Sequence, residues 1–454
     1  MATTGRRPTS ALAEVLRLRP FRRLWLVFGL SSLGDWLGLL ATSSFAAAQL
    51  SSSAAQGAAF GGVIAIQLLP WLVLGPMAGV LADRFDRRHT MVTVDVLRFL
   101  LFASIPLAAE VLPGRAEVVA WAAVASFLAQ VGAMVWTPAK EAAVPNLLPG
   151  DRLETANQLT IVTTYGITPV LAALAFAGAG RLPGLGRAGA PAVALYFDAL
   201  TFLASAVVVA LGVPEISGRG GTGIRESARA ALRTGWRYLA GSPLMRGLAI
   251  GLFGAFAGAG IVVGAAEFYA RSLGGGDSTF ALLFAGLFVG FGIGVAAGPA
   301  VVGRLSRRRA FGLSVMLAGL AVGLLAAMPR LGGALAIVLV VGLGAGTALL
   351  YGVTIIGADV PDAVRGRVFA FLQASARVVL LLSVAAASAL AGAGSSFVVR
   401  WGSVAVDVSS SRVLLVVAGL CGAGAGVAAL RQMDDRAGVA LLPDLWRALT
   451  RRDR

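Results

Sequence analysis

Charged residues are scarce in this sequence. Asp, Glu, Lys and Arg make up 13% of its 454 residues, whereas 57% are apolar. In a soluble protein roughly a quarter of the residues are charged, so this composition excludes a soluble globular chain and indicates a protein that crosses the bilayer repeatedly. The net charge of +16 comes from short arginine clusters between apolar runs. It therefore does not form the continuous basic surface of a nucleic-acid-binding protein.

Cysteine, histidine and lysine are nearly absent. The sequence contains one of each, Cys421, His89 and Lys140. A single cysteine cannot form an internal disulfide and is expected to pack as a small residue. The residues around Lys140 do not fit the phosphate-binding loop of an ATP-driven pump, and the H-E-x-x-H and G-x-S-x-G patterns of hydrolases do not occur. We therefore predict no enzyme, no primary pump, no cofactor and no metal site.

The sequence consists largely of long apolar runs. A helix needs ~20 apolar residues to cross a bilayer, and twelve runs come close to or exceed that length. The first run is longer than the core of a signal peptide, so we expect it to remain as a helix. The sequence thus predicts an all-α integral membrane protein with twelve transmembrane helices. The runs cover residues 24–48, 58–82, 90–112, 117–137, 156–179, 190–212, 246–270, 279–303, 310–328, 332–355, 368–392 and 412–430.

The arginines predict the orientation. Most of the 38 basic residues lie at the N-terminus, in the loops after the even-numbered runs, and in the C-terminal tail. Basic loops stay on the cytoplasmic side, so both termini are predicted to be cytoplasmic, which requires an even number of spans. Heavy use of Ala, Gly and Arg is typical of GC-rich bacterial genomes. We therefore expect a multi-pass protein of the bacterial inner (plasma) membrane.

A long connection divides the runs into six plus six. We predict a six-helix bundle at 1–212, a cytoplasmic linker at 213–245, a second six-helix bundle at 246–430 and a cytoplasmic tail at 431–454. The linker carries apolar and arginine residues on opposite faces of a predicted helix, which lies on the inner leaflet or forms a solvated linker. GPMAGVLADRFDRR after the second run is echoed by GPAVVGRLSRRR after the eighth. Such repetition predicts two pseudo-symmetric bundles with a site at their interface.

The hairpin after the second run carries the clearest motif. Its residues resemble the G-x-x-x-D-R-x-G-R-R signature of the major facilitator superfamily, with Asp86 where the signature has Gly. GDWL in the first run, YFDALTF in the sixth and VPDAVRGRVFAF before the eleventh are similar to bacterial exporters related to the enterobactin exporter. The resemblance covers about residues 20–380. The matching hairpin residues are Gly79, Asp83, Arg84, Arg87 and Arg88.

The resemblance implies the major facilitator fold, alternating access and a cytoplasmic gate at this hairpin. Asp83 is expected to attract the N-terminus of the eleventh helix, where Gly366 and Arg367 lie, because a helix N-terminus favours an anion. The alternative is that the hairpin only sets the topology. Asp95 and Arg98, three residues apart in the third run, can pair with each other and are expected to join the gate.

Charged groups inside spans are costly, so each one suggests a function. Asp35, in the middle of the first run, is the leading candidate. It can alternate between protonated and ionised states, or act as a structural acid. Arg377 can receive an anionic substrate, pair with a carboxylate, or extend to the interface. Asp198, in the sixth run, is expected to be structural. Other polar groups that can face a substrate cleft are Gln67, Gln130, Tyr165 and Tyr351.

These features together predict a proton-coupled exporter of small amphipathic compounds, either drug-like or siderophore-like. Its expected partners are a small-molecule substrate, protons and the lipid bilayer, and it is expected to act as a monomer. The fourth run lacks the arginine that proton antiporters of this superfamily commonly carry, so antiport is less secure than transport. The alternatives are an importer or uniporter of the same fold, and a transport-inactive membrane sensor or assembly scaffold.

Overall fold

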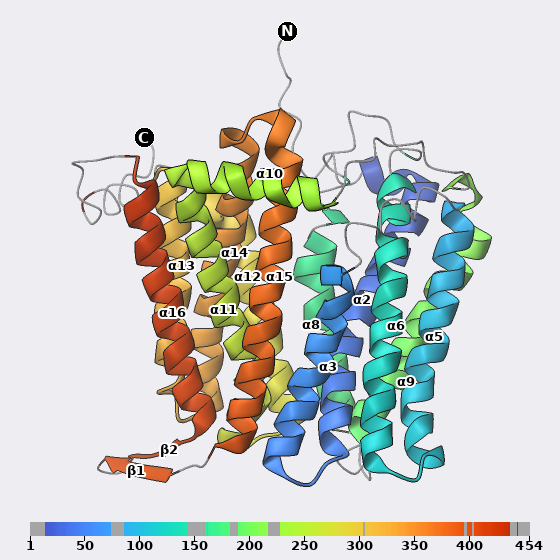
Figure 1. The fold of residues 1–454 in the computed structure, drawn as a ribbon. Helices are drawn as coiled ribbons and strands as arrows, with labels where there is room; N and C mark the ends of the chain where they lie inside the picture. Colours follow the sequence, from blue (N-terminus) through green and yellow to red (C-terminus); the bar gives the residue numbers. More distant parts are fainter. Residues whose placement is uncertain are drawn as a thin grey trace. The chain divides into compact units, whose positions relative to one another are not determined.

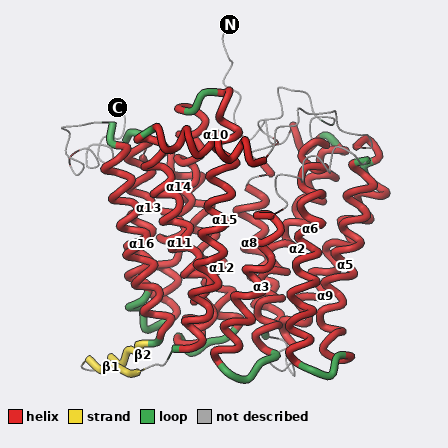
Figure 2. Tube along the Cα trace, viewed as in Figure 1, coloured by secondary structure: helices red, strands yellow, loops and turns green. Residues whose placement is uncertain are grey.

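The computed structural model describes residues 14–73, 86–143, 147, 156, 159–160, 162–181, 189–216, 228–302, 305–394, 397–401, 404–435 and 443. Eleven helices in this part of the chain are long and apolar enough to cross a membrane. A shorter apolar helix, Thr163–Ala179, occupies the position of the fifth predicted run. The helices follow one another along the described chain with few strands between them (Figure 2).

The chain divides into two compact units, which we describe separately. Unit 1 comprises Met1–Ser51 and Ile66–Ile224, and unit 2 comprises Ser52–Ala65 and Arg225–Arg454. Helix α3 (Ser53–Val73) therefore contributes residues to both. The other elements of unit 1 are α2 (Arg19–Ala48), α5 (Arg87–Val111), α6 (Arg115–Ala143), the π-helical turn η3 (Thr163–Ile167), α8 (Thr168–Ala179), α9 (Gly189–Gly212) and the 3₁₀ turn η4 (Pro214–Ile216).

Among the described residues, unit 2 consists of part of α3, seven further helices and one hairpin. Its helices are α10 (Ala228–Gly241), α11 (Pro243–Ser272), α12 (Asp277–Val302), α13 (Arg307–Leu325), α14 (Leu331–Asp359), α15 (Asp362–Ala393) and α16 (Ser410–Met433). Strands β1 (Phe397–Trp401) and β2 (Val404–Val408) pair antiparallel between α15 and α16, at the lower left of Figure 1. The sequence does not predict this hairpin. Its valine-rich strands favour extended pairing, but they are too short to stand out between two spans.

In unit 1, α9 packs against both α2 and α5. The approach to α2 is close because Gly34 and Gly38 face α9: a Cβ on Gly34 would lie 2.6 Å from Phe202 of α9. Small residues allow helix backbones to approach one another within a membrane, where no hydrophobic force drives them together. An apolar core that includes Phe21, Phe28 and Trp136 packs α2 against its neighbours.

In unit 2, glycines also allow close contacts between helices. Helices α11 and α13 pack against α16, and α12 packs against α14. At Gly319 of α13, a Cβ would lie 2.2 Å from the backbone nitrogen of Ala423 in α16. At Gly290 of α12, it would lie 2.1 Å from the carbonyl oxygen of Leu339 in α14. These helices are therefore in backbone contact, which larger side chains would prevent.

The linker helix α10 runs across the ends of the spanning helices of unit 2 (Figure 1). Its Leu239 is buried in the core of unit 2, and the Trp236 ring lies 5.8 Å from that of Phe371 in α15. Arg233 and Arg237 are exposed. Part of the apolar side of the predicted amphipathic helix thus packs on unit 2 through Leu239, while Trp236 is 55% exposed.

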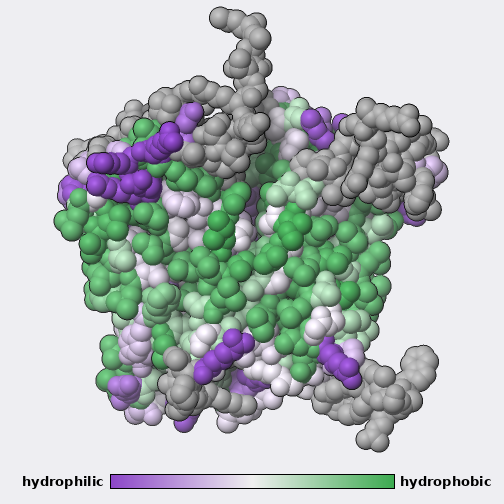
Figure 3. Space-filling model, turned by 180° about the vertical axis from the view of Figure 1, so that it is seen from behind, coloured by the Kyte–Doolittle hydropathy of each residue, from purple (hydrophilic) through white to green (hydrophobic). Residues whose placement is uncertain are grey.

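The surface of the spanning helices is largely apolar, as their sequences are. Many large apolar side chains are exposed along the spanning helices, including Leu107 at 49% and Leu200 at 55%. In the space-filling view, hydrophobic residues cover the middle of the helices and hydrophilic ones gather near their ends (Figure 3). A broad apolar surface on a folded chain matches lipid rather than water.

Candidate functional site

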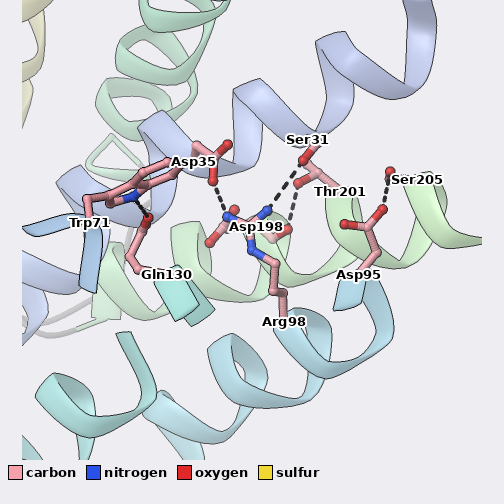
Figure 4. Close-up of polar contacts among 9 residues, drawn as sticks. All are labelled: Ser31, Asp35, Trp71, Asp95, Arg98, Gln130, Asp198, Thr201 and Ser205. Atoms are coloured by element: carbon pink, nitrogen blue, oxygen red, sulfur yellow. Dashed lines mark hydrogen bonds and ion pairs between the residues drawn. The ribbon is translucent and has the colours of Figure 1, made fainter. Parts of the chain in front are cut away.

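Arg98 is the centre of a charged cluster inside unit 1. It lies near the middle of α5, and its side chain is fully buried. The guanidinium donates to the carboxylate of Asp35 in α2 and to Ser31 Oγ at 3.4 Å. Its Cζ lies 4.0 Å from the centroid of the Phe202 ring in α9, within the range of a cation–π contact. Residues from three helices therefore surround one positive charge (Figure 4).

Asp35 is the exposed member of the cluster. Its side chain is 43% exposed, whereas that of its partner Arg98 is 0% exposed. The neighbouring part of α2 is fixed to η3 and α8, because Trp36 Nε1 donates to the Thr164 carbonyl at 2.9 Å and Ser32 Oγ lies 2.7 Å from Thr168 Oγ1. The predicted mid-span acid is thus held on an anchored helix, and its side chain is partly exposed.

Asp198 belongs to the third helix of this cluster and lies near the middle of α9. It is 0% exposed, and neither carboxylate oxygen has a hydrogen-bond partner among the described residues. It is seated against the two glycines of α2: a Cβ on Gly34 or Gly38 would lie 2.9 or 2.8 Å from its oxygens. The glycines therefore make the space that this carboxyl group occupies.

Asp95 is also fully buried. One of its oxygens accepts a hydrogen bond from Ser205 Oγ of α9 at 2.6 Å, and the other has no partner among the described residues. The predicted pairing of Asp95 with Arg98 is wrong. Both residues lie on the face of α5 that packs against its neighbours, but the long arginine side chain reaches Asp35 on α2, while the shorter Asp95 is bonded to α9.

The cluster contains the carboxyl groups of Asp35, Asp95 and Asp198 and the guanidinium of Arg98. A buried carboxylate that lacks a compensating charge costs several kcal/mol, and it avoids that cost by taking up a proton. The arrangement is therefore suited to binding and releasing protons.

The remaining polar candidates come from helices other than α2, α5 and α9. In unit 1, Gln130 Oε1 accepts from Trp71 Nε1 at 3.2 Å, Gln67 is buried, and Tyr165 in η3 is 48% exposed. In unit 2, Tyr351 is buried in the apolar core and Arg377 is half-buried in α15. The cluster brings Asp35 together with Arg98 and Asp198.

The hairpin residues Gly79, Asp83 and Arg84 lie outside the described residues. Arg87 is the first residue of α5, and Asp86 caps that helix by accepting from His89 N at 3.0 Å. Arg88 donates to the Ala210 carbonyl near the end of α9. Helix α15 begins at Asp362, earlier than the sequence predicted, so Gly366 and Arg367 lie one turn inside it and not at its N-terminus. The gate itself stays a prediction.

Asp198 is the member of the cluster that the sequence did not connect with Asp35. Its position inside a span marks it as costly, but nothing in the sequence pairs α9 with α2 and α5. The usable signal is the spacing of Gly34 and Gly38, which lie four residues, or about one helical turn, apart and predict a close helix contact on that face.

Comparisons with known proteins agree with this architecture. A nucleoside transporter, NupG, has a TM-score of 0.70 at 12% identity, covering 92% of this chain and all of that one (100%). A D-xylose–proton symporter has a TM-score of 0.69 at 14% identity, covering 93% of this chain and 99% of the other. At these identities the likeness concerns the fold, and it confirms the predicted major facilitator fold.

Sequence relatives identify the family. The model of the transmembrane secretion effector family matches residues 9–444. An uncharacterised MFS-type transporter of Mycobacterium tuberculosis is 30% identical over 411 residues, which cover 85% of this chain and 88% of the relative. Macrolide efflux protein A of Streptococcus pyogenes is 30% identical over 112 residues, or 24% of this chain and 27% of that protein. The chain therefore belongs to the transmembrane secretion effector family of the major facilitator superfamily, and is a multi-pass membrane transporter rather than an enzyme.

Proposed function

We propose that this transporter is a proton-coupled exporter of small amphipathic compounds that works by alternating access. The observation that carries the proposal is the Asp35–Arg98 ion pair in the middle of the helices of unit 1. A charge in a span costs ~2.5–3.5 kcal/mol on insertion scales, so charged groups kept there mark transport pathways and proton relays. Asp35 combines such a position with access to water.

A proton on Asp35 changes the energy of the whole cluster. Protonation removes the negative charge that compensates Arg98, whose guanidinium is fully buried. A buried cation without its partner is strongly destabilised, so α2, α5 and α9 gain from rearranging around it. Proton binding is thereby linked to helix packing, as alternating access requires.

Sequence similarity and a cavity bear on the substrate class. The partial similarity to macrolide efflux protein A favours export over import. Unit 2 contains a cavity between α11, α14 and α15 that suits an apolar group. Its lining includes Leu248, Phe256, Val353 and Phe369, with Gln373 as a polar member. Siderophore-like cargo, suggested by the resemblance to the enterobactin exporter, belongs to the same proposal.

The predicted topology completes the proposal. It comprises two six-helix bundles at 1–212 and 246–430, both termini in the cytoplasm of a bacterium, a monomer as the working unit, and a cytoplasmic gate at residues 75–88. A mid-span acid and arginine are unnecessary for a transport-inactive sensor, and their presence favours transport over that role.

The test is a susceptibility screen in a bacterial host that lacks its own exporters, with macrolides and other amphipathic compounds. We expect the chain to protect the host against at least one compound. Protection should disappear in Asp35→Asn and after a protonophore collapses the proton gradient. Asp359→Asn, which removes a half-exposed carboxylate paired with Arg308 at 3.6 Å, should still protect. Protection that survives both Asp35→Asn and the protonophore would contradict proton coupling, and increased susceptibility would indicate import.

A further inference from the structure

The buried carboxyl group of Asp198 has no role in the ion pair that carries the proposed function. It is 0% exposed, and its two oxygens accept no hydrogen bond from a described residue. Thr201 Oγ1 is only one turn away, yet it donates to the backbone carbonyl of Asp198 at 2.7 Å and not to the carboxyl group. An ionised carboxylate in this setting would be left without any donor, which is the most costly state for a buried acid.

The charged groups around Asp198 come from the helices that pack against α9. Helix α2 presents Asp35, and α5 presents Arg98 and Asp95, while α8 carries no titratable residue. The other charged groups of these helices lie near their ends, such as Arg23 of α2, which donates to the Gly212 carbonyl at 2.9 Å. Among the described residues, Arg98 is thus the one cation in the middle of this unit, and it is paired with Asp35.

We propose that Asp35 and Asp198 share one proton and compete for Arg98. In the observed state Asp35 is ionised and paired with Arg98, while Asp198 holds the proton. In the alternate state the O–H bond of Asp198 is broken and one is formed at Asp35, and Arg98 pairs with Asp198. The proton count and the net charge of the pair are the same in both states. Asp35, as the exposed member, exchanges the proton with water. This inference rests on the proposed function and deepens it.

The geometry provides for such an exchange. Gly34 and Gly38 place no side chain between the α2 backbone and the carboxyl group of Asp198. The ring of Phe202, one turn beyond Asp198 on α9, lies 4.0 Å from the guanidinium and stacks on Phe102 with 5.6 Å between centroids. A flat aromatic face stabilises a cation without fixing its hydrogen bonds, so Arg98 can turn from one carboxylate to the other. Asp95 is excluded from the pair because it already accepts from Ser205.

Infrared spectroscopy of the purified protein in lipid nanodiscs tests the proposal without substrate. A protonated carboxyl group gives a carbonyl-stretch band that an ionised one lacks. We expect this band at neutral pH in the unmodified protein and its loss in Asp198→Asn. The decisive variant is Asp35→Asn: Arg98 then takes Asp198 as its partner, Asp198 ionises, and the band disappears as well. Glu267→Gln removes a buried carboxylate that is paired with Arg271 and should leave the band unchanged.

Three results would overturn the proposal. If the band persists in Asp198→Asn, or if Asp95→Asn removes it instead, the proton is not on Asp198. If Asp35→Asn retains the band, Asp198 is a permanently protonated acid and does not compete for Arg98. Should Asp198→Asn fail to fold, the Asp35→Asn spectrum still decides between competition and a fixed proton. The expected spectra combined with export that ignores the proton gradient would refute the proposed function alone.

Discussion

Buried charge lies in the middle of the helices in unit 1 and near helix ends in unit 2. Among the described residues, the buried charged groups of unit 1 are Asp95, Arg98 and Asp198, each at 0% exposure. Those of unit 2 are Glu267, Arg309 and Arg412. Arg309 lies in the first turn of α13 and Arg412 in the first turn of α16, while Glu267 lies near the end of α11.

The two sets also differ in how they are satisfied. In unit 2, Glu267 pairs with Arg271, and Arg309 donates to Asp434 at 2.8 and 3.0 Å. Arg412 donates to the carbonyls of Ala326 and Met328, which follow the end of α13. The contacts of Arg412 satisfy backbone carbonyls at a helix end, which otherwise lack partners. In unit 1 the carboxyl groups outnumber the cation and two of the acids have oxygens without partners among the described residues, so the first set is suited to proton chemistry and the second to structure.

The largest expected effect follows from removing the single cation of the cluster. Arg98→Met leaves the buried acids of unit 1 without compensation, and breaking a buried ion pair costs ~3–5 kcal/mol. We expect a marked drop in the melting temperature of the detergent-solubilised protein and loss of export. Adding Asp35→Leu should recover part of the stability but not export. A melting temperature equal to that of the unmodified protein would show that Arg98 does not compensate the buried acids of unit 1.

In unit 2, Arg309→Met should lower stability while export continues. Arg309 is 1% exposed and makes two parallel hydrogen bonds to Asp434, whose side chain is 33% exposed. Hydrogen bonds to charged groups contribute ~1.5–3 kcal/mol, and the partly exposed Asp434 regains water when its partner is lost. Thermal unfolding and the susceptibility assay should therefore separate in this variant. Loss of export at unchanged stability would assign Arg309 a role in transport.

The smallest expected effect concerns the glycines beneath the cluster. In Gly34→Ala the added Cβ would lie 2.6 Å from Phe202 and 2.9 Å from Asp198. Overpacking of this kind costs ~1–3 kcal/mol, and export should fall with it because Asp198 is displaced. Gly62→Ala in α3 is the matched control, since a Cβ added there would meet nothing within 4 Å. If both variants behave alike in thermal unfolding and export, the close α2–α9 contact does not position Asp198.

The positions of the helices could be predicted because each membrane-spanning helix requires a run of ~20 apolar residues, which is visible in the sequence. The predicted run at 190–212 corresponds to α9 (Gly189–Gly212), and 332–355 corresponds to α14 (Leu331–Asp359). The short ninth run, 310–328, corresponds to α13 (Arg307–Leu325), which begins among its arginines because Ser306 accepts from Arg309 N at 3.3 Å and caps the helix.

The candidate site could be predicted only in part. Asp35 stands out because an acid inside a span is costly wherever its helix packs. Its partner Arg98 could not be predicted. Whether Arg98 pairs with Asp95 or with Asp35 depends on the tertiary contact between α5 and α2. The sequence alone favours a structural role for Asp198 for the same reason: only the packing of α9 brings it to the cluster.

Transport by the purified protein in liposomes tests the central claim most directly. The assay compares two modes with a compound from the screen, uptake driven by an imposed pH gradient and exchange of labelled for unlabelled compound without a gradient. We predict that Asp35→Asn loses gradient-driven uptake and keeps exchange, while Glu267→Gln keeps both. Gradient-driven uptake by Asp35→Asn equal to that of the unmodified protein would contradict the account, because the charge cluster of unit 1 would then have no part in proton coupling.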